Sequence, residues 1–337
     1  MRAALYYGAG DVRIEDVPEP SPGPGEVLVR VLANGLCGTD LHQYDVGPLS
    51  DAPLPIIVGH ELAGEIVGVG EGVSRSRVGE LVAVEPIWRC NDCGPCHDGD
   101  YNLCLKGPWH GLTGMGGGLC ELTVVRDEMA WAVPDGIDPM DAAVVEPMAV
   151  AFHGIERAAV TPGDRAVVLG AGPIGLGAYL GLRAEGVDQV AVVEPSPERR
   201  AAAEAVGAPA VLDPTDGSAT EAIAELFGGA GATVAIDAAG TQGSFDTAVA
   251  VAAPKARIVL VAAFAESVQF NPLAVLQRET RIDMAFAYRG TFGPVLRHMA
   301  AGRYPTSPWV RHMALDDVVE AYGMLHRREA VKLLIDI

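Results

Sequence analysis

Residues 166–175 read AVVLGAGPIG and run directly into the helical LGAYL at 176–180. The first four residues are apolar and predict a buried strand. A G-x-G-x-x-G turn between a strand and a helix is typical of dinucleotide binding. Gly170 makes the tight turn, Gly172 lets the backbone approach a pyrophosphate, and Gly175 permits close packing of helix on strand. We therefore expect a pyrophosphate at the N-terminus of this helix.

A second apolar strand, VAVV at residues 190–193, ends at Glu194, 19 residues after Gly175. An acidic side chain at this spacing accepts hydrogen bonds from the adenosine ribose hydroxyls and repels a 2′-phosphate. The alternative is a solvated carboxylate at a strand end. Arg199 and Arg200 follow closely, so the sequence favours NAD and leaves some tolerance of NADP open. The expected cofactor-binding residues are Gly170, Gly172, Pro173, Ile174, Gly175, Glu194 and Arg199.

The composition changes around residue 146, where strands begin to alternate with Ala-rich helical segments. Later strands are expected at residues 233–237 and 256–261. This alternation is typical of a parallel sheet covered by helices. Residues 261–264 should then lie at the carboxyl edge of the sheet, where such folds bind ligands.

The first 85 residues read as β-rich, with short apolar runs such as 27–32 between clusters of Gly and Pro. The glycines of GEIVGVG, residues 64–70, lack a strand-then-helix setting, so we interpret them as turns and a close approach of strands. A helix at 315–322 and a strand at 330–335 end the chain, which we expect to return to the first domain.

A metal site is indicated by Cys37-Gly-Thr-Asp40-Leu-His42 and by Gly59-His60-Glu61. Thiolate and imidazole donors together suit Zn²⁺, and a catalytic zinc takes three protein ligands and leaves one position open. Cys37 and His60 would supply two ligands and a distant carboxylate the third. Taken singly, a buried apolar thiol and a satisfied core histidine are the alternatives.

Four further cysteines are spaced C-x2-C-x2-C-x7-C, at Cys90, Cys93, Cys96 and Cys104. Four thiolates this close in sequence can surround one Zn²⁺ tetrahedrally, and such a closed site is structural. Bacterial ferredoxins also use C-x2-C-x2-C, so an iron–sulfur cluster is the alternative. Their fourth cysteine comes sooner and precedes Pro, whereas Cys104 precedes Leu105. Cys120 is left over and is expected to pack as a small apolar residue.

The composition limits the class of partner. The chain has 337 residues and a net charge of −20, which argues against nucleic acid or an anionic membrane surface. It lacks an apolar run of about 18 residues, and its apolar N-terminal segment is too short for a signal peptide. We therefore expect a cytoplasmic, reducing compartment, where six cysteines indicate metal ligands rather than disulfides.

Together these motifs resemble the zinc-containing medium-chain alcohol and polyol dehydrogenases over essentially the whole chain. GLTG at residues 111–114, GGG at 116–118 and Glu146-Pro147 are further markers. Tyr44-x-x-Gly-Pro and the EPxAVA that begins at Glu146 resemble most the branch of 2,3-butanediol and sorbitol dehydrogenases.

The resemblance implies an α/β protein with two domains. A GroES-like, β-rich catalytic zinc domain would comprise residues 1–147 and 286–337, with a structural zinc lobe at about 88–106. A Rossmann domain with a doubly wound parallel sheet would comprise residues 148–285 and bind NAD. The family also implies two zinc ions per chain and a homodimer or homotetramer.

The resemblance also assigns metal ligands. Cys37 and His60 match the ligands of the catalytic zinc, and Glu61 and Glu146 match the positions that complete it, one directly and the other through water or in exchange. Classical alcohol dehydrogenases have Cys in place of Glu146, so a carboxylate there points to the polyol side of the family. Asp40 matches the carboxylate that orients the imidazole of His60.

The expected reaction transfers a hydride between a secondary alcohol, such as a vicinal diol or polyol, and NAD. By resemblance, Thr39 contacts the reacting oxygen and His42 is the outer end of a proton relay. Tyr44 lines the substrate pocket or serves packing, and Glu146 could bind a second substrate hydroxyl.

Three alternatives remain. The same apparatus would serve an L-threonine or amino-polyol dehydrogenase. A non-catalytic nucleotide-sensing relative would keep the fold and lose turnover. A zinc-free quinone or enoyl reductase ranks last, because such proteins lack both the four-cysteine lobe and the pair of Cys37 and His60.

Overall fold

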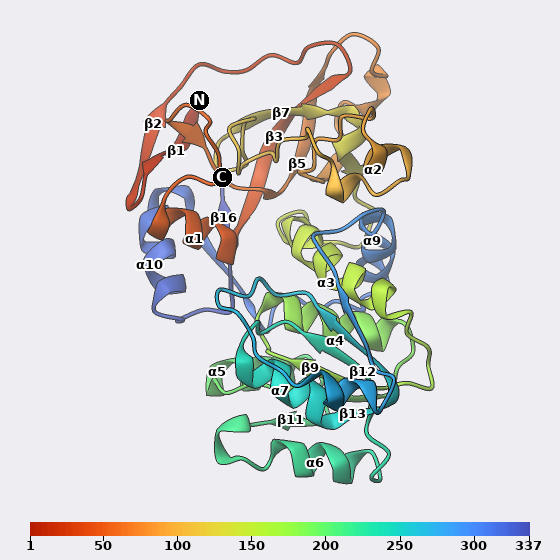
Figure 1. Ribbon diagram of the computed structural model, residues 1–337. Helices are drawn as coiled ribbons and strands as arrows, with labels where there is room; N and C mark the ends of the chain where they lie inside the picture. The colour runs from red at the N-terminus through yellow and green to blue at the C-terminus, as the bar shows by residue number, and fades with distance from the viewer. The chain divides into compact units, whose positions relative to one another are not determined.

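The computed structural model describes all 337 residues, which fold into two compact units. The first unit comprises residues 1–146, 292–301 and 309–337, and the second comprises residues 147–291 and 302–308. Figure 1 shows the elements of both units, coloured along the chain. The structure contains no helix with the length and apolar character that spanning a membrane requires.

The second boundary of this division differs from the boundary expected at residue 286, because residues 286–291 and 302–308 fall in the second unit. The latter segment packs on the helix Pro173–Ala184. Arg303 donates from Nη1 to the Ala184 carbonyl at 2.7 Å, and the buried Tyr304 reaches the backbone of that helix.

The first unit is built mainly of strands and short helices. Its strands are β1 (Arg2–Gly8), β2 (Asp11–Asp16), β3 (Glu26–Leu36), β4 (Ile56–Ile57), β5 (Glu61–Val69), β6 (Leu81–Val84), β7 (Leu122–Arg126), β8 (Ala130–Ala132), β15 (Val310–Ala314) and β16 (Lys332–Asp336). Its helices are α1 (Gly38–Val46), α2 (Gly94–His97), α9 (Phe292–Ala300) and α10 (Val318–His326), with 3₁₀ turns η1 (Arg75–Arg77), η2 (Tyr101–Leu103), η3 (Asp127–Met129), η4 (Asp141–Val144) and η6 (Leu315–Asp317).

A seven-stranded sheet in the order β15-β16-β3-β5-β6-β8, with β7 also paired to β3, organises the first unit. The last strand, β16, runs antiparallel to β3, so the chain does return to its first domain as predicted (Figure 1). The close strand approach predicted for residues 64–70 is also present, because a Cβ on Gly64 would collide with the backbone of Arg30 on β3.

The expectation of a β-rich segment over residues 1–85 misses one helix, α1. This helix begins after Cys37, whose sulfur accepts the Thr39 N–H at 3.4 Å, while the Asp40 carboxylate accepts the Cys37 N–H at 2.9 Å. The two contacts form a capping box, which stabilises the N-terminus of a helix.

The second unit contains a six-stranded parallel sheet. Its strands are β9 (Arg165–Leu169), β10 (Gln189–Val193), β11 (Val211–Leu212), β12 (Ala232–Asp237), β13 (Ala252–Leu260) and β14 (Arg281–Met284). Its helices are α3 (Val145–Ala158, which begins in the last two residues of the first unit), α4 (Pro173–Ala184), α5 (Pro197–Ala205), α6 (Ala219–Leu226), α7 (Gln242–Val251) and α8 (Pro272–Leu276), with the 3₁₀ turn η5 (Pro214–Asp216).

The strand order is β11-β10-β9-β12-β13-β14, which is 3-2-1-4-5-6 when counted within this unit. That order defines the doubly wound Rossmann sheet. The strands are continuous runs of buried apolar residues, such as Val167, Val192 and Ile258, because helices pack on both faces of a parallel sheet. Residues 261–264 follow β13 directly, at the carboxyl edge predicted for them.

A buried carboxylate ties three parts of this sheet together. Asp164, just before β9, accepts hydrogen bonds from the Thr233 hydroxyl on β12 at 2.7 Å and from the Thr161 backbone at 2.7 Å. It also pairs with Arg257 on β13. Burial raises the pKa of Asp164, but these partners outweigh burial and hold the pKa below its usual value.

We expect Asp164→Asn to lower the free energy of unfolding by about 2 kcal/mol, because it leaves buried donors without a charged acceptor. Urea denaturation followed by circular dichroism measures this loss. Asp188→Asn is the matched control, because Asp188 forms an exposed pair with Arg183 and its loss should cost less than about 1 kcal/mol. Equal losses in the two variants would contradict the role given to Asp164.

Candidate functional site

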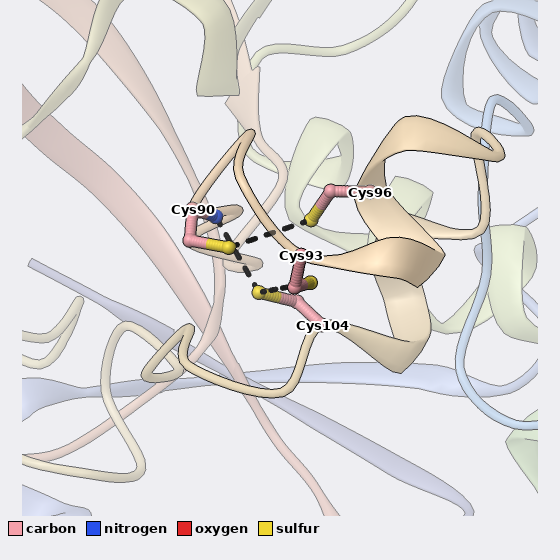
Figure 2. Close-up of side chains that lie close together, drawn as sticks. All are labelled: Cys90, Cys93, Cys96 and Cys104. Atoms are coloured by element: carbon pink, nitrogen blue, oxygen red, sulfur yellow. Dashed lines mark hydrogen bonds between the residues drawn. The ribbon is translucent and has the colours of Figure 1, made fainter.

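The four cysteines predicted to bind one metal ion do meet in space, and Figure 2 shows their side chains turned toward one another. Cys93 and Cys96 lie at the start of α2 and within it, Cys90 precedes this helix, and Cys104 follows η2. The Cys90 and Cys96 sulfurs are 3.9 Å apart, and those of Cys93 and Cys104 are 4.0 Å apart. All four sulfurs lie within 4.8 Å of one another.

This geometry fits a tetrahedral zinc ion. With Zn–S bonds of about 2.3 Å, the sulfurs of such a site are about 3.8 Å apart. A disulfide would need about 2.05 Å, and all six cysteines of the chain are free. Burial raises the pKa of Cys104, but hydrogen bonds from the backbone at Lys106 and Cys90 outweigh burial and lower that pKa to about 6. The thiolate form that metals require is thereby favoured.

A buried glutamate holds this cysteine lobe against the sheet. Glu85, just after β6, accepts one hydrogen bond from the Tyr101 hydroxyl within the lobe and one from the Trp131 indole on β8, each at 2.7 Å. Burial raises the pKa of Glu85. Because the carboxylate joins the lobe to two strands, the lobe has a fixed position within the first unit.

The second candidate group comprises Cys37, His60 and Glu61, whose ligand atoms also lie within 4.8 Å of one another. Cys37 caps α1, His60 directly precedes β5, and Glu61 is the first residue of β5. The pairing of β3 with β5 sets Gly35 opposite Glu61. Gly35 comes two residues before Cys37, so Cys37 lies close to the start of β5. One strand pairing therefore brings the sulfur, the imidazole and the carboxylate together.

Asp40 organises two of these ligands. Its Oδ1 lies 3.1 Å from His60 Nδ1, and its Oδ2 accepts the Cys37 N–H. The contact at Nδ1 leaves Nε2 of the imidazole for a metal, which is the arrangement expected when a carboxylate orients a histidine ligand. Burial lowers the pKa of His60, but Asp40 and Cys37 outweigh burial and raise that pKa well above its usual value.

Glu61 has a partner that the sequence analysis missed. Lys332 on β16 is buried, pairs with Glu61 Oε2 and donates to the Leu36 carbonyl at 2.9 Å. Burial lowers the pKa of Lys332, but the charges of Glu61, Cys37 and Glu146 outweigh burial and raise it. The one signal in the sequence was a charged residue in an apolar strand, VKLLI.

The structure leaves untested the predicted roles of Glu146, Thr39, His42 and Tyr44. Glu146 is buried in the first turn of α3, and its charge acts on Lys332, but it is outside the group of three ligands. Thr39 and His42 are exposed on α1. Tyr44 stacks on Tyr322 of α10 with ring centroids 4.7 Å apart, which is a packing contact. The metal, relay and substrate roles of these residues stay predictions.

The glycine-rich turn has the geometry that the motif requires. Gly170 has a φ of +95°, which glycine adopts readily, and a Cβ on Gly175 would collide with the Gly170 carbonyl. Gly172 caps α4, with Pro173 as the first helical residue and Ile174 next. A Cβ at Gly172 would meet one neighbour within 4 Å, the Arg199 guanidinium at 3.8 Å, so the backbone at the helix N-terminus is open to a ligand.

Glu194 closes the other side of this turn. It is buried, and its two oxygens accept backbone N–H groups of Ala171 at 2.7 Å and Ser196 at 2.8 Å. Arg200 is occupied, because it donates to the Glu194 carbonyl at 2.9 Å and pairs with Asp213 at 2.9 Å. The carboxylate predicted to meet a ribose is thus fixed beside the turn.

Comparison with known proteins agrees with the fold and with a zinc-binding family. The family described as "Alcohol dehydrogenase GroES-like domain" matches residues 23–135, and "Zinc-binding dehydrogenase" matches residues 173–301.

Two relatives are similar along their whole length. The (R,R)-butanediol dehydrogenase of Bacillus subtilis is 35% identical, with 99% of each chain covered. The sorbitol dehydrogenase of Bombyx mori is 34% identical, with 99% of this chain and 98% of the relative covered. A crystal structure of an alcohol dehydrogenase from Escherichia coli CFT073 complexed with NADH is 30% identical. It covers 100% of this chain and 99% of its own, with a TM-score of 0.92.

The first family match lies within the first unit, and the second covers most of the second unit together with residues 292–301 of the first. The relatives extend over almost the whole chain. The cysteine lobe and the Cys37–His60–Glu61 group are two sets of side chains that could each hold a metal ion. The chain therefore belongs to the zinc-containing medium-chain alcohol dehydrogenase family.

Proposed function

We propose that this protein is a zinc-dependent dehydrogenase that transfers a hydride between a secondary alcohol and NAD. The observation that carries the proposal is the convergence of Cys37, His60 and Glu61, supported by Asp40. Three protein ligands leave one position for water or substrate, which distinguishes a catalytic zinc from a structural one. The similarity to butanediol and sorbitol dehydrogenases supports a vicinal diol or polyol as the alcohol.

In this site Cys37, His60 and one of the carboxylates Glu61 and Glu146 would hold the ion. A bound zinc ion supplies a Lewis acid that polarises the carbinol oxygen and favours loss of its proton. Thr39 would hydrogen-bond that oxygen, and His42, exposed on the same helix, would pass the proton to solvent. Tyr44 and Glu146 would contact the rest of the substrate.

We assign a structural role to the four-cysteine lobe. A site with four sulfur ligands has no open position, so it stabilises its loop and takes no direct part in chemistry. The proposal therefore requires two zinc ions per chain, one at each of the two ligand groups.

NAD is the proposed cofactor, bound at Gly170, Gly172, Pro173, Ile174 and Gly175, with Glu194 on the ribose. Glu194 presents a carboxylate where NADP carries its 2′-phosphate. Arg200 is engaged with Asp213, which leaves Arg199 as the cation nearest the turn. Solved relatives bind either form of the cofactor, since one is complexed with NADH and another with NADP, so the choice of NAD rests on Glu194.

We propose that the protein acts as a homodimer or homotetramer in the cytoplasm. The edge strand β14 and its surroundings expose large apolar side chains, among them Leu276, Met284 and Phe286, which a second copy would cover. Six free cysteines suit a reducing compartment.

An L-threonine or amino-polyol substrate is the alternative to a vicinal diol or polyol. Rates with butanediol, sorbitol and threonine in the presence of NAD separate these possibilities.

We expect Cys37→Ser to abolish turnover and remove one of the two zinc ions while the fold is retained, because the thiolate ligand is lost. Zinc per chain by atomic absorption and rates of NADH formation measure this. Cys120→Ala is the control, since Cys120 is buried away from both ligand groups. Full turnover by Cys37→Ser would refute the catalytic site.

Cys93→Ser should act on stability first. Loss of the lobe's metal removes several kcal/mol, which corresponds to roughly 10 °C in melting temperature for a chain of this size. Differential scanning calorimetry provides the measurement, with Cys37→Ser for comparison. If Cys93→Ser removed activity and left melting and oligomer size unchanged, the structural assignment would be wrong.

Glu194→Ala should narrow the preference for NAD over NADP by roughly tenfold, the effect of losing about one charge-assisted hydrogen bond. The ratio of kcat/KM for the two cofactors is the measurement. Glu204→Ala, an exposed change on the same helix as Arg199, should leave the ratio as it is. An unchanged ratio in Glu194→Ala would remove Glu194 from cofactor recognition.

A further inference from the structure

Lys332 is the one buried lysine of this chain. The sequence contains three lysines, and Lys106 and Lys255 are exposed, whereas Lys332 is 1% exposed. An ammonium group is buried only where partners compensate its lost hydration. Lys332 is therefore expected to have acceptors for its ammonium group inside the protein.

The Lys332 ammonium has two identified acceptors, Glu61 Oε2 and the Leu36 carbonyl at 2.9 Å. The carboxylate of Glu61 is itself 1% exposed. The backbone of β3 is shaped around this pair, because a Cβ on Gly35 would collide with Glu61 Oε2 and come within 3.0 Å of Lys332 Cε. The pair is thus enclosed by the same strand that leads into Cys37.

We propose that Lys332 is a positioning residue that occupies one oxygen of Glu61, so that Glu61 offers only its other oxygen to a metal. This inference rests on the proposed catalytic zinc at Cys37, His60 and Glu61. Glu61 is then a one-oxygen ligand that can leave the ion and return to its lysine, and the open coordination position is preserved for the substrate.

The positive charge of Lys332 predicts the direction of its effect on metal release. The ammonium lies beside the ligand group, where it repels a divalent cation and competes with that cation for the Glu61 carboxylate. Without the ammonium, the metal would be the only cation available to a buried carboxylate, which would bind it more firmly. A lysine with a purely structural role predicts the opposite, because its loss would loosen the ligand group and release the metal faster.

The test measures zinc release from the purified, fully loaded protein into a chelating dye, with wild type, Lys332→Met, Lys332→Arg and Lys255→Met compared. Lys332→Met should release the catalytic zinc more slowly by roughly tenfold, because it removes the charge that repels the ion and competes for Glu61. Lys332→Arg, which keeps the cation, and Lys255→Met, an exposed control, should match wild type. Equal or faster release from Lys332→Met would overturn the inference.

Glu61→Gln provides a second arm that does not depend on a lysine variant folding well. With the ammonium in place and the carboxylate neutralised, zinc should leave faster than from wild type. Adding Lys332→Met to Glu61→Gln should then change release less than it does in the wild-type background, because the two residues act through one contact. Unchanged release from Glu61→Gln, or equal effects of Lys332→Met in both backgrounds, would also overturn the inference.

Zinc content of the wild-type protein separates this inference from the proposed function. If wild type holds zinc only at the cysteine lobe, the proposed catalytic site fails, and the role of Lys332 fails with it. If wild type holds two zinc ions and turns over an alcohol, the proposed function stands. If the Lys332→Met variant then loses its catalytic zinc faster than wild type does, the inference alone fails.

Discussion

The antiparallel pairing of β3 with β5 is the interaction on which the first unit depends. It sets Gly35 opposite Glu61, so that the end of one strand delivers Cys37 and the start of the other delivers His60 and Glu61. A slip of this register by one residue would turn the Glu61 side chain to the other face of the sheet. The ligand group is therefore a property of a strand register, and the adjacent β16 adds its lysine to the same place.

Much of the fold could be predicted because the relevant signals are local. A few consecutive residues are enough to predict the apolar strands and the glycine turn of the second unit. Strands β9, β10 and β12 lie within one residue of the expected bounds. Four cysteines in a span of 15 residues can meet only within their own loop, so the sequence predicted the Cys90 to Cys104 group as well.

The features that escaped prediction depend on long-range contacts or on weak local patterns. Helix α1 has few apolar residues and is set by the capping contacts of Cys37 and Asp40, so its periodicity is slight. The partner of Glu61 is 271 residues away, and only the strand order of the folded sheet joins them. The role of Glu146 is likewise undecided by spacing, because it begins a helix far from the other ligands along the chain.

The two members of the Glu61–Lys332 pair are far apart in the order of synthesis. The donors Cys37, His60 and Glu61 are synthesised close together, whereas Lys332 lies 271 residues after Glu61 along the chain. A nascent chain therefore carries the anionic donors without their counter-charge. In the folded protein β16 pairs with β3 and places that counter-charge beside Glu61.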